Sequence, residues 1–287
     1  MSRIVLLTLL YLITLHCWGK GNVTFTTKDS ARIVRLLTTA KKLSPSPTSW
    51  TLYFARQFVG TPYVGGTLDR AREERLVINL PELDCTTYVE QVLALARCAE
   101  LGSTSFGDFC EQLRHIRYVG GEIAYVKRQH YFTGWIEDNE NELIVKEIQL
   151  PNPPFTASIS VNVNWMTTHV KNYKMLSAHP EWVSGIRNME KAISGKRYRY
   201  IPKAAVNNTK LLRQTIHDGD ILAIVTDKQG LDISHIGFAV WHADGLHLLN
   251  ASSIHKRVID EPMTLRQYLW KSRRRLGIWV IRCLGPS

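Results

Sequence analysis

Three apolar runs in the last third of the chain constrain its fold more than any other feature of the sequence. The stretch GDILAIVTDKQGLDISHIGFAVWHADGLHLLNASS, residues 219–253, holds these runs at 220–227, 235–241 and 246–252. The turn signals KQG and ADG separate them. Short apolar runs between such turns are typical of strands that pair in sequence order. We therefore expect an antiparallel meander that ends in a hairpin around Asp244 and Gly245.

The loop length of that hairpin decides whether two polar side chains meet. Pairing Ala243 with Leu246 leaves a two-residue turn, and pairing Trp241 with Leu246 leaves a four-residue loop. Either register puts His235 and Asn250 on the same face of the sheet, whereas a three-residue loop separates them. With the four-residue loop they are diagonal neighbours, within reach of each other.

Cys85 stands where a helix is expected to begin. The sequence NLPELDCTTYVEQVLAL places it directly after Asp84, and the helix that Asp84 opens should run to about Leu101. A thiol at a helix start is easier to ionise, because the helix dipole favours the anion by about 0.3–2 kcal/mol. The apolar residues that share its helix face are Tyr88, Val89, Val92 and Ala96. Cys85 should therefore press against the core, either as a nucleophile or as a packing cysteine.

The remaining segments read as parts of one domain. Helical spacing predicts helices over 28–42 and 50–58, which form an N-terminal helical extension at 20–60. Residues 103–215 are read as an insertion that elaborates the same domain, because they show neither repeats nor a Ser/Gly linker. Within the insertion, 116–148 suggests strands and loops, and 179–195 looks helical. Cys98 lies on a different helix face from Cys85 and is expected to fill the core.

Cys85, His235 and Asn250 together fit a cysteine hydrolase. Such enzymes need a thiolate, a histidine that forms an ion pair with it and later protonates the leaving amine, and a third group that orients the imidazole. Proton transfer by His235 would contribute roughly 10²–10⁴ in rate. The backbone N–H of Cys85 and the hydroxyl of Tyr63 are candidate oxyanion donors. The alternatives stay open: a packing cysteine, a structural sheet histidine, and an ordinary amide at Asn250, which also lies in the glycosylation sequon NAS.

Composition excludes several other classes of function. Hydrophobic residues at 45% and charged residues at 21% are typical of a globular protein with a sizeable core. The formal net charge is +11, partly in KSRRRLG near the C-terminus, which is either a solvated basic face or a surface for an anionic partner. No nucleic-acid-binding motif is present. The cysteines form no CxxC pair and no Cys/His spacing typical of zinc, so no metal or cofactor is expected.

The N-terminus predicts export. A basic Arg3, an apolar run from Ile4 to Leu15 and small residues before Lys20 fit a signal peptide over residues 1–19. Cys17 is alternatively a lipid anchor, although His16 is a poor fit to the residue expected before it. No later segment is long and apolar enough to span a membrane, so residues 20–287 should form a soluble single domain, expected to be monomeric.

Four motifs resemble a known superfamily. GTPYVGG, LDCTTYVEQV, SHIGFAVW and LLNASS are similar, in order, to the motifs of NlpC-type, papain-like cell-wall hydrolases, and KRQHYFTGWIEDN is similar to the N-acetylmuramoyl-L-alanine amidase-like branch of Bacteroides-type bacteria. The resemblance implies an α+β fold in which the cysteine helix packs on the antiparallel sheet that carries the histidine. It also implies Cys85 as nucleophile, His235 as base and Asn250 as third residue, with Tyr63, Ser234 and Asp84 as oxyanion or substrate-binding residues. Histidine is frequent at the third place, so Asn250 is a departure within the variation known for the superfamily.

The implied activity is cleavage of the amide between N-acetylmuramic acid and L-alanine in peptidoglycan or its fragments, in the periplasm or cell envelope of a Gram-negative bacterium. The insertion should build walls of the substrate groove. The first alternative is an endopeptidase that cuts between D-Glu and diaminopimelate in the stem peptide. A catalytically inactive wall-binding protein and a papain-like protease are the others.

Overall fold

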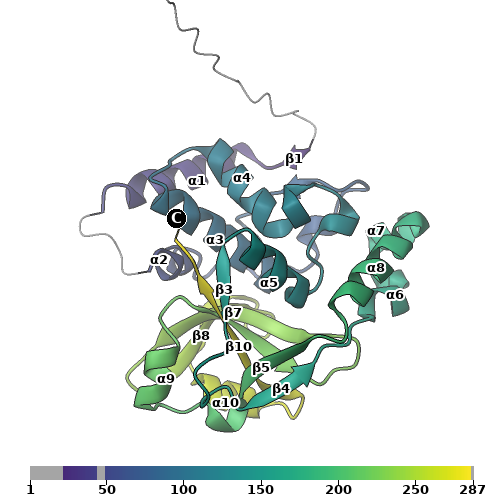
Figure 1. Ribbon diagram of the computed structural model, residues 1–287. Coiled ribbons are helices and arrows are strands. Elements are labelled where there is room, and N and C mark those ends of the chain that lie inside the picture. The colour runs from purple at the N-terminus through teal and green to yellow at the C-terminus, as the bar shows by residue number, and fades with distance from the viewer. Residues whose placement is uncertain (1–21, 44–48, 286–287) are drawn as a thin grey trace, which may run out of the picture.

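An eight-stranded antiparallel sheet organises the chain (Figure 1). The computed structural model describes residues 22–43 and 49–285. The strand order is β4-β5-β10-β6-β7-β8-β9, and β3 also pairs with β10. Its strands are β3 (Val145–Ile148), β4 (Ala157–Ser160), β5 (Arg197–Pro202), β6 (Ile221–Thr226), β7 (Ile233–Trp241), β8 (Leu246–Ser252), β9 (Arg257–Asp260) and β10 (Arg275–Cys283). A separate parallel pair joins β1 (Val23–Thr24) to β2 (Leu76–Val77).

Helices cover both faces of this sheet (Figure 1). On one side lie α1 (Thr27–Ala40), α2 (Trp50–Arg56), α3 (Cys85–Glu100), α4 (Phe106–Arg117) and α5 (Phe132–Asn141). On the other side lie α9 (Lys210–Thr215) and α10 (Leu265–Trp270), while α6 (Trp165–Thr168), α7 (Lys174–Ala178) and α8 (Val183–Ile193) gather beside the end of β4 and β5. Every residue of β6 is buried, as expected of a strand covered on both faces.

Short 3₁₀ turns connect these elements. They are Thr67–Asp69, Val119–Gly121, Tyr125–Lys127, Val170–Asn172, Pro180–Trp182 and Lys203–Ala205. None of the helices in the described part of the chain has the length and hydropathy needed to cross a lipid bilayer.

The meander and the predicted helices are confirmed. β6, β7 and β8 pair in sequence order, and α1, α2, α3 and α8 lie within or next to the predicted helical segments. The coarse α+β class with an antiparallel sheet is likewise confirmed. Inside the insertion 103–215, β3 and β5 pair with β10, and β4 pairs with β5. The insertion thus contributes strands to the main sheet.

The expectation of strands and loops over 116–148 holds for β3 but is wrong for residues 132–141. Helix α5 occupies Phe132–Asn141, and its buried side chains Phe132, Trp135, Ile136 and Asn139 recur at helical spacing. Aromatic residues and Thr133 give this segment the composition of a strand. Tertiary packing overrides that preference, because Asn139 Nδ2 donates to the carbonyl oxygens of Ile116 and Trp135 from within the core.

A buried ion pair fixes helix α3 against its neighbour α4. Arg117 Nε lies 2.7 Å from Glu90 Oε2, and both side chains are almost fully buried. Arg117 also donates through Nη1 to the Val77 carbonyl at 2.7 Å, so the pair connects α3, α4 and β2. Because α3 begins at Cys85, this pair helps to define where the thiol lies.

Removing one member of this pair should be costly. Arg117→Met leaves the Glu90 carboxylate buried without a cation, and the free energy of unfolding should fall by about 3–5 kcal/mol. Lys196→Met is the control, because it breaks an exposed pair with Glu137 and should cost about 0–1 kcal/mol. Urea unfolding followed by circular dichroism measures both. Equal, small losses in the two variants would contradict the structural role given to Arg117.

Candidate functional site

Asp84 caps the helix that carries the candidate nucleophile. Its Oδ1 accepts the Thr87 backbone N–H at 2.8 Å, and the Thr87 hydroxyl accepts the Asp84 backbone N–H at 3.0 Å. This reciprocal capping box makes Cys85 the first residue of α3, as predicted. The Asp84 carboxylate is therefore engaged in the cap, and a role for it in binding substrate stays a prediction.

The surroundings of Cys85 oppose ionisation of the free thiol. Burial raises the pKa of Cys85 to about 12, and the neighbouring Asp84 carboxylate adds to this rise. Hydrogen bonding to the sulfur from the Ile236 backbone and from Thr86 lowers the pKa, but by less. Burial of the free thiol thus acts in the direction opposite to the one expected of the helix start.

His235 and Asn250 form a hydrogen-bonded pair. His235 Nε2 lies 2.8 Å from Asn250 Oδ1, and Asn250 Nδ2 donates to the Leu248 carbonyl at 3.1 Å. A carbonyl only accepts, so the Leu248 contact fixes which end of the amide faces the imidazole. Nε2 must then carry the proton, and the neutral ring keeps an unprotonated Nδ1. That nitrogen is the one able to act as a base.

The four-residue hairpin register brings this pair together. Trp241 pairs with Leu246, so Asn250 lies opposite Gly237 and diagonal to His235, as one of the sequence-based alternatives predicted. A Cβ at Gly237 would lie 2.8 Å from Asn250 Cβ and 2.8 Å from the Leu249 carbonyl oxygen. Only glycine permits this close approach of β7 to β8.

A β-bulge at Ser234 precedes the histidine. Ile224 pairs with His235 and Val225 pairs with Ile233, so Ser234 is the extra residue on β7. Its side chain is exposed, and its hydroxyl donates to the Ile224 carbonyl at 3.3 Å. Burial lowers the pKa of His235 below its usual value; the Arg275 charge adds to this, whereas the Asn250 hydrogen bond and Asp84 oppose it. The imidazole is therefore neutral near pH 7.

Cys85 and His235 line one cavity of about 170 Å³. The sulfur lies against the backbone of Ile236, the residue that follows His235. No hydrogen bond joins the thiol to the imidazole among the described residues. The cavity is lined by Cys85, Thr86, Gln129, His130, Tyr131, Phe132, Trp135, Leu231, Asp232, Ile233, Ser234 and His235. Ser234 therefore belongs to the cavity wall, whereas Asp84 and Tyr63 are not among its lining residues.

Tyr63 nevertheless lies near the sulfur. Burial raises its pKa to about 12, and the charges of Cys85 and Asp84 contribute to that rise. The hydroxyl thus stays protonated at neutral pH and can donate. Its loop is held by the bond from Val64 N–H to the Leu83 carbonyl at 3.0 Å, two residues before Cys85. The Cys85 backbone N–H has no intrahelical acceptor, as expected at a first helical position.

The insertion supplies one wall of the cavity, through residues that the sequence analysis passed over. His130 lines the cavity, and its Nε2 lies 2.8 Å from the Tyr125 carbonyl oxygen. Burial and Arg128 lower the pKa of His130 to about 3, so the ring is neutral. Trp135 is buried, and its Nε1 has no hydrogen-bond acceptor within the described residues. The only sequence signal was the dense polar and aromatic run RQHYF.

Two further residues lie beside the histidine. The Tyr268 ring centroid is 6.4 Å from that of His235, and the Arg275 guanidinium lies over the Tyr268 ring at 3.9 Å. Nothing in their local sequence pointed to the site. The basic run that contains Arg275 was noted only as a possible anionic-partner surface.

The other cysteines take no part in this cavity. All four described cysteines, Cys85, Cys98, Cys110 and Cys283, are free thiols. Cys98 is fully buried in the core, as predicted. Cys17 and the predicted signal peptide at 1–19 lie outside the described residues.

Comparisons with known proteins show the family to which the chain belongs. The family described as AmiA-like, N-acetylmuramoyl-L-alanine amidase-like, matches residues 53–278. The chain belongs to the AmiA-like family. That range contains the cysteine helix, the insertion and the His235–Asn250 hairpin, so the family assignment covers every residue of the candidate site.

Solved structures support the AmiA-like assignment. An N-acetylmuramoyl-L-alanine amidase from Bacteroides uniformis is 33% identical, with a TM-score of 0.77 over 82% of this chain and 98% of that one. A Bacteroides fragilis protein described as a candidate xylanase is 36% identical, with a TM-score of 0.75 over 80% and 99%. A Legionella pneumophila protein of family DUF1460, at 24% identity and a TM-score of 0.69 over 90% and 95%, supports the fold alone. No curated protein matches the chain.

Gly237→Ala tests the geometry of the His235–Asn250 pair. The added Cβ must push Asn250 away from the imidazole, so catalytic turnover that depends on His235 should fall by about 10-fold or more. The protein should stay folded, with a loss of about 1–3 kcal/mol in the free energy of unfolding. Gly107→Ala is the control, because its Cβ meets only the Ser105 hydroxyl oxygen at 3.4 Å. Steady-state kinetics and thermal unfolding measure the two effects. Unchanged turnover in Gly237→Ala would contradict the importance of this approach.

Proposed function

We propose that this AmiA-like protein is a cysteine-dependent N-acetylmuramoyl-L-alanine amidase, which hydrolyses the amide between the lactyl group of N-acetylmuramic acid and L-alanine. The observation that carries the proposal is the shared cavity of Cys85 and His235, with Asn250 fixing the imidazole tautomer. The similar protein from Bacteroides uniformis is an N-acetylmuramoyl-L-alanine amidase, which supports this choice of bond.

In the proposed mechanism, His235 acts as a general base on a neutral thiol. As the sulfur of Cys85 attacks the lactyl carbonyl carbon, its proton moves to His235 Nδ1. A preformed thiolate is not required, which agrees with the raised pKa of Cys85 and the lowered pKa of His235. Asn250 Oδ1 accepts the Nε2 proton throughout and stabilises the imidazolium while it exists.

The negative charge on the carbonyl oxygen needs donors that are already in place. The Cys85 backbone N–H at the start of α3 is one, and the protonated hydroxyl of Tyr63 is the second candidate. Each such donor is worth about 10²–10³ in rate.

Collapse of the tetrahedral intermediate breaks the C–N bond. The L-alanine nitrogen leaves with the proton from His235, and a thioester joins the lactyl group to Cys85. His235 then takes a proton from water, which attacks the thioester carbon. This step returns the free thiol and releases the lactyl carboxylic acid on the sugar.

The charge near the site suits an anionic substrate. Lys271, Arg273 and Arg274 are exposed in the turn between α10 and β10, next to Arg275. Arg275 is near enough to His235 to depress its pKa. Stem peptides carry free carboxylates, so this basic turn should attract them. A peptidoglycan substrate also agrees with the predicted export signal, and we propose the cell envelope as the location.

Two other activities are less well supported. A stem-peptide endopeptidase would use the same three residues on a different bond, and the amidase relative favours the bond nearer the sugar. Glycoside hydrolysis, suggested by the description of the Bacteroides fragilis relative, usually needs a pair of carboxyl groups. Asp232 is the only carboxylate among the lining residues of the described cavity, and it accepts bonds from the Thr133 N–H and hydroxyl.

Cys85→Ala and a defined muropeptide test the proposal. Turnover should fall by more than about 10³-fold, because the covalent step is lost. Cys283→Ala is the control, since it removes another half-buried free thiol that lies outside the cavity. Mass spectrometry of the digest should show a free stem peptide that begins with L-alanine.

Three outcomes would contradict the proposal. Activity of Cys85→Ala near that of the unmutated protein would exclude the nucleophile. A sugar product that retains L-alanine and D-glutamate would show the endopeptidase instead of the amidase. A digest without products in the unmutated protein would support a wall-binding role.

A further inference from the structure

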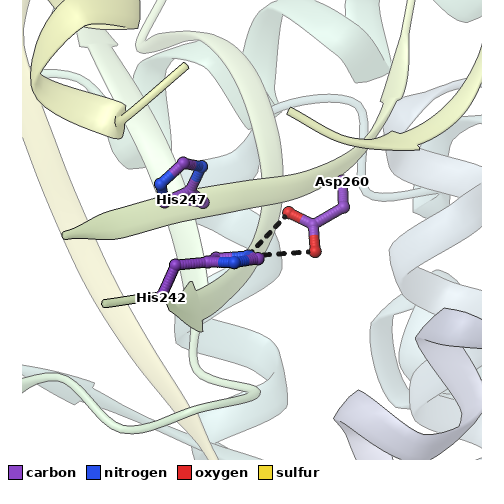
Figure 2. Close-up of side chains that lie close together, drawn as sticks. All are labelled: His242, His247 and Asp260. Atoms are coloured by element: carbon purple, nitrogen blue, oxygen red, sulfur yellow. Dashed lines mark hydrogen bonds and ion pairs between the residues drawn. The ribbon is translucent and has the colours of Figure 1, made fainter. Parts of the chain in front are cut away.

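A second cluster of chemically active side chains lies at the far end of the hairpin (Figure 2). His242 follows β7, His247 lies on β8, and Asp260 ends β9. One ligand atom from each lies within 4.8 Å of the others. Their spacing along the sequence matches no metal motif, because the pairing of β7, β8 and β9 is what brings them together. None of them lines the Cys85 cavity.

The contacts of His247 place an acceptor beside each of its ring nitrogens. Its Nδ1 lies 2.8 Å from the Glu261 carbonyl oxygen, so this nitrogen must carry a proton. In the neutral tautomer, Nε2 then presents a lone pair, yet it lies 3.0 Å from Asp244 Oδ1, which is also an acceptor. Two acceptors at this distance require a cation, either a second proton on the ring or a metal ion. His247 is only 4% exposed, so an ion bound there would be largely shielded from solvent.

The contact between His242 and Asp260 also has the geometry of a metal site. His242 Nε2 lies 3.2 and 3.1 Å from the two carboxylate oxygens of Asp260 (Figure 2). Zinc holds imidazole nitrogen and carboxylate oxygen at about 2.0–2.2 Å, so neighbouring ligand atoms in a tetrahedron are about 3.3 Å apart. The His242–Asp260 separation is already close to that edge length.

Backbone hydrogen bonds hold the strands and the loop that carry the three ligands. His247 pairs with Val240, and Asp260 pairs with Leu249, the neighbour of Asn250. The His242 N–H donates to the Gly245 carbonyl at 2.8 Å and closes the loop. The bond from His247 Nδ1 to a backbone carbonyl is also the arrangement that orients metal-binding histidines.

We propose that His242, His247 and Asp260 bind a divalent transition metal ion of the zinc class. The ion connects the hairpin loop to β9 and stabilises the strand that carries Asn250. This inference does not rest on the proposed amidase activity.

Zinc binding to the full chain in a Cys85→Ala background tests the proposal. This background removes the Cys85 thiol, so Cys85 and His235 can no longer bind Zn²⁺ together. Calorimetry after chelator treatment should show one equivalent of Zn²⁺ bound, and thermal unfolding should move to higher temperature with added Zn²⁺. His242→Ala and Asp260→Asn should each lower the affinity by about 10-fold or more and abolish the thermal shift.

His217→Ala is the matched control, because it removes an exposed histidine outside the cluster and should leave binding unchanged. Binding that survives both His242→Ala and Asp260→Asn would overturn the proposal, as would the absence of binding. Nuclear magnetic resonance of the histidine ring nitrogens gives a second readout. Nε2 of His247 should lose any proton when Zn²⁺ is added, and a retained proton at one equivalent would contradict the site.

Discussion

The hydrogen bond between His235 and Asn250 is the interaction on which the account of this site depends. Asn250 Nδ2 is committed to the Leu248 carbonyl, so Oδ1 must face the ring and Nε2 must hold the proton. The tautomer is thereby set by backbone geometry two residues away. Gly237 allows the two strands to approach closely enough for this bond. A single hairpin register thus decides which imidazole nitrogen is free to accept a proton.

The electrostatics of the cavity then define the kind of catalysis that is possible. Burial acts on both reacting groups in the direction that favours the neutral form: the pKa of the thiol rises and that of the imidazole falls. A group with a lowered pKa is deprotonated at and above neutrality, so His235 is available as a base there and is lost only as the pH falls through its depressed pKa. The helix start contributes chiefly by positioning the sulfur and the free N–H of Cys85.

Local patterns in the sequence predicted the parts that depend on local physics. The helix that begins at Cys85 follows from the Asp84 cap and apolar spacing, and the hairpin follows from strand alternation around Asp244 and Gly245. The four-residue register was one of the alternatives that the sequence left open. Turn chemistry and periodicity are short-range, so one sequence is enough to read them.

The parts that were missed depend on contacts between distant segments. Helix α5 was read as strands and loops, because its aromatic residues are buried by packing that the sequence does not display. The cavity wall at His130 and Trp135, the neighbours Tyr268 and Arg275, and the cluster around His247 all arise from tertiary pairing. The raised pKa of Cys85 has the same origin, since desolvation is a property of the surroundings and not of the helix end alone.

The rate of Cys85 alkylation by iodoacetamide as a function of pH tests the central claim most directly. Mass spectrometry of the Cys85 peptide separates this thiol from Cys98, Cys110 and Cys283. With His235 as the base, the rate should stay level around neutral pH and fall only in acid. In His235→Gln the level region should disappear, and the rate should climb toward the thiol pKa of about 12 that burial imposes. Identical profiles in the two proteins would contradict proton transfer from Cys85 to His235.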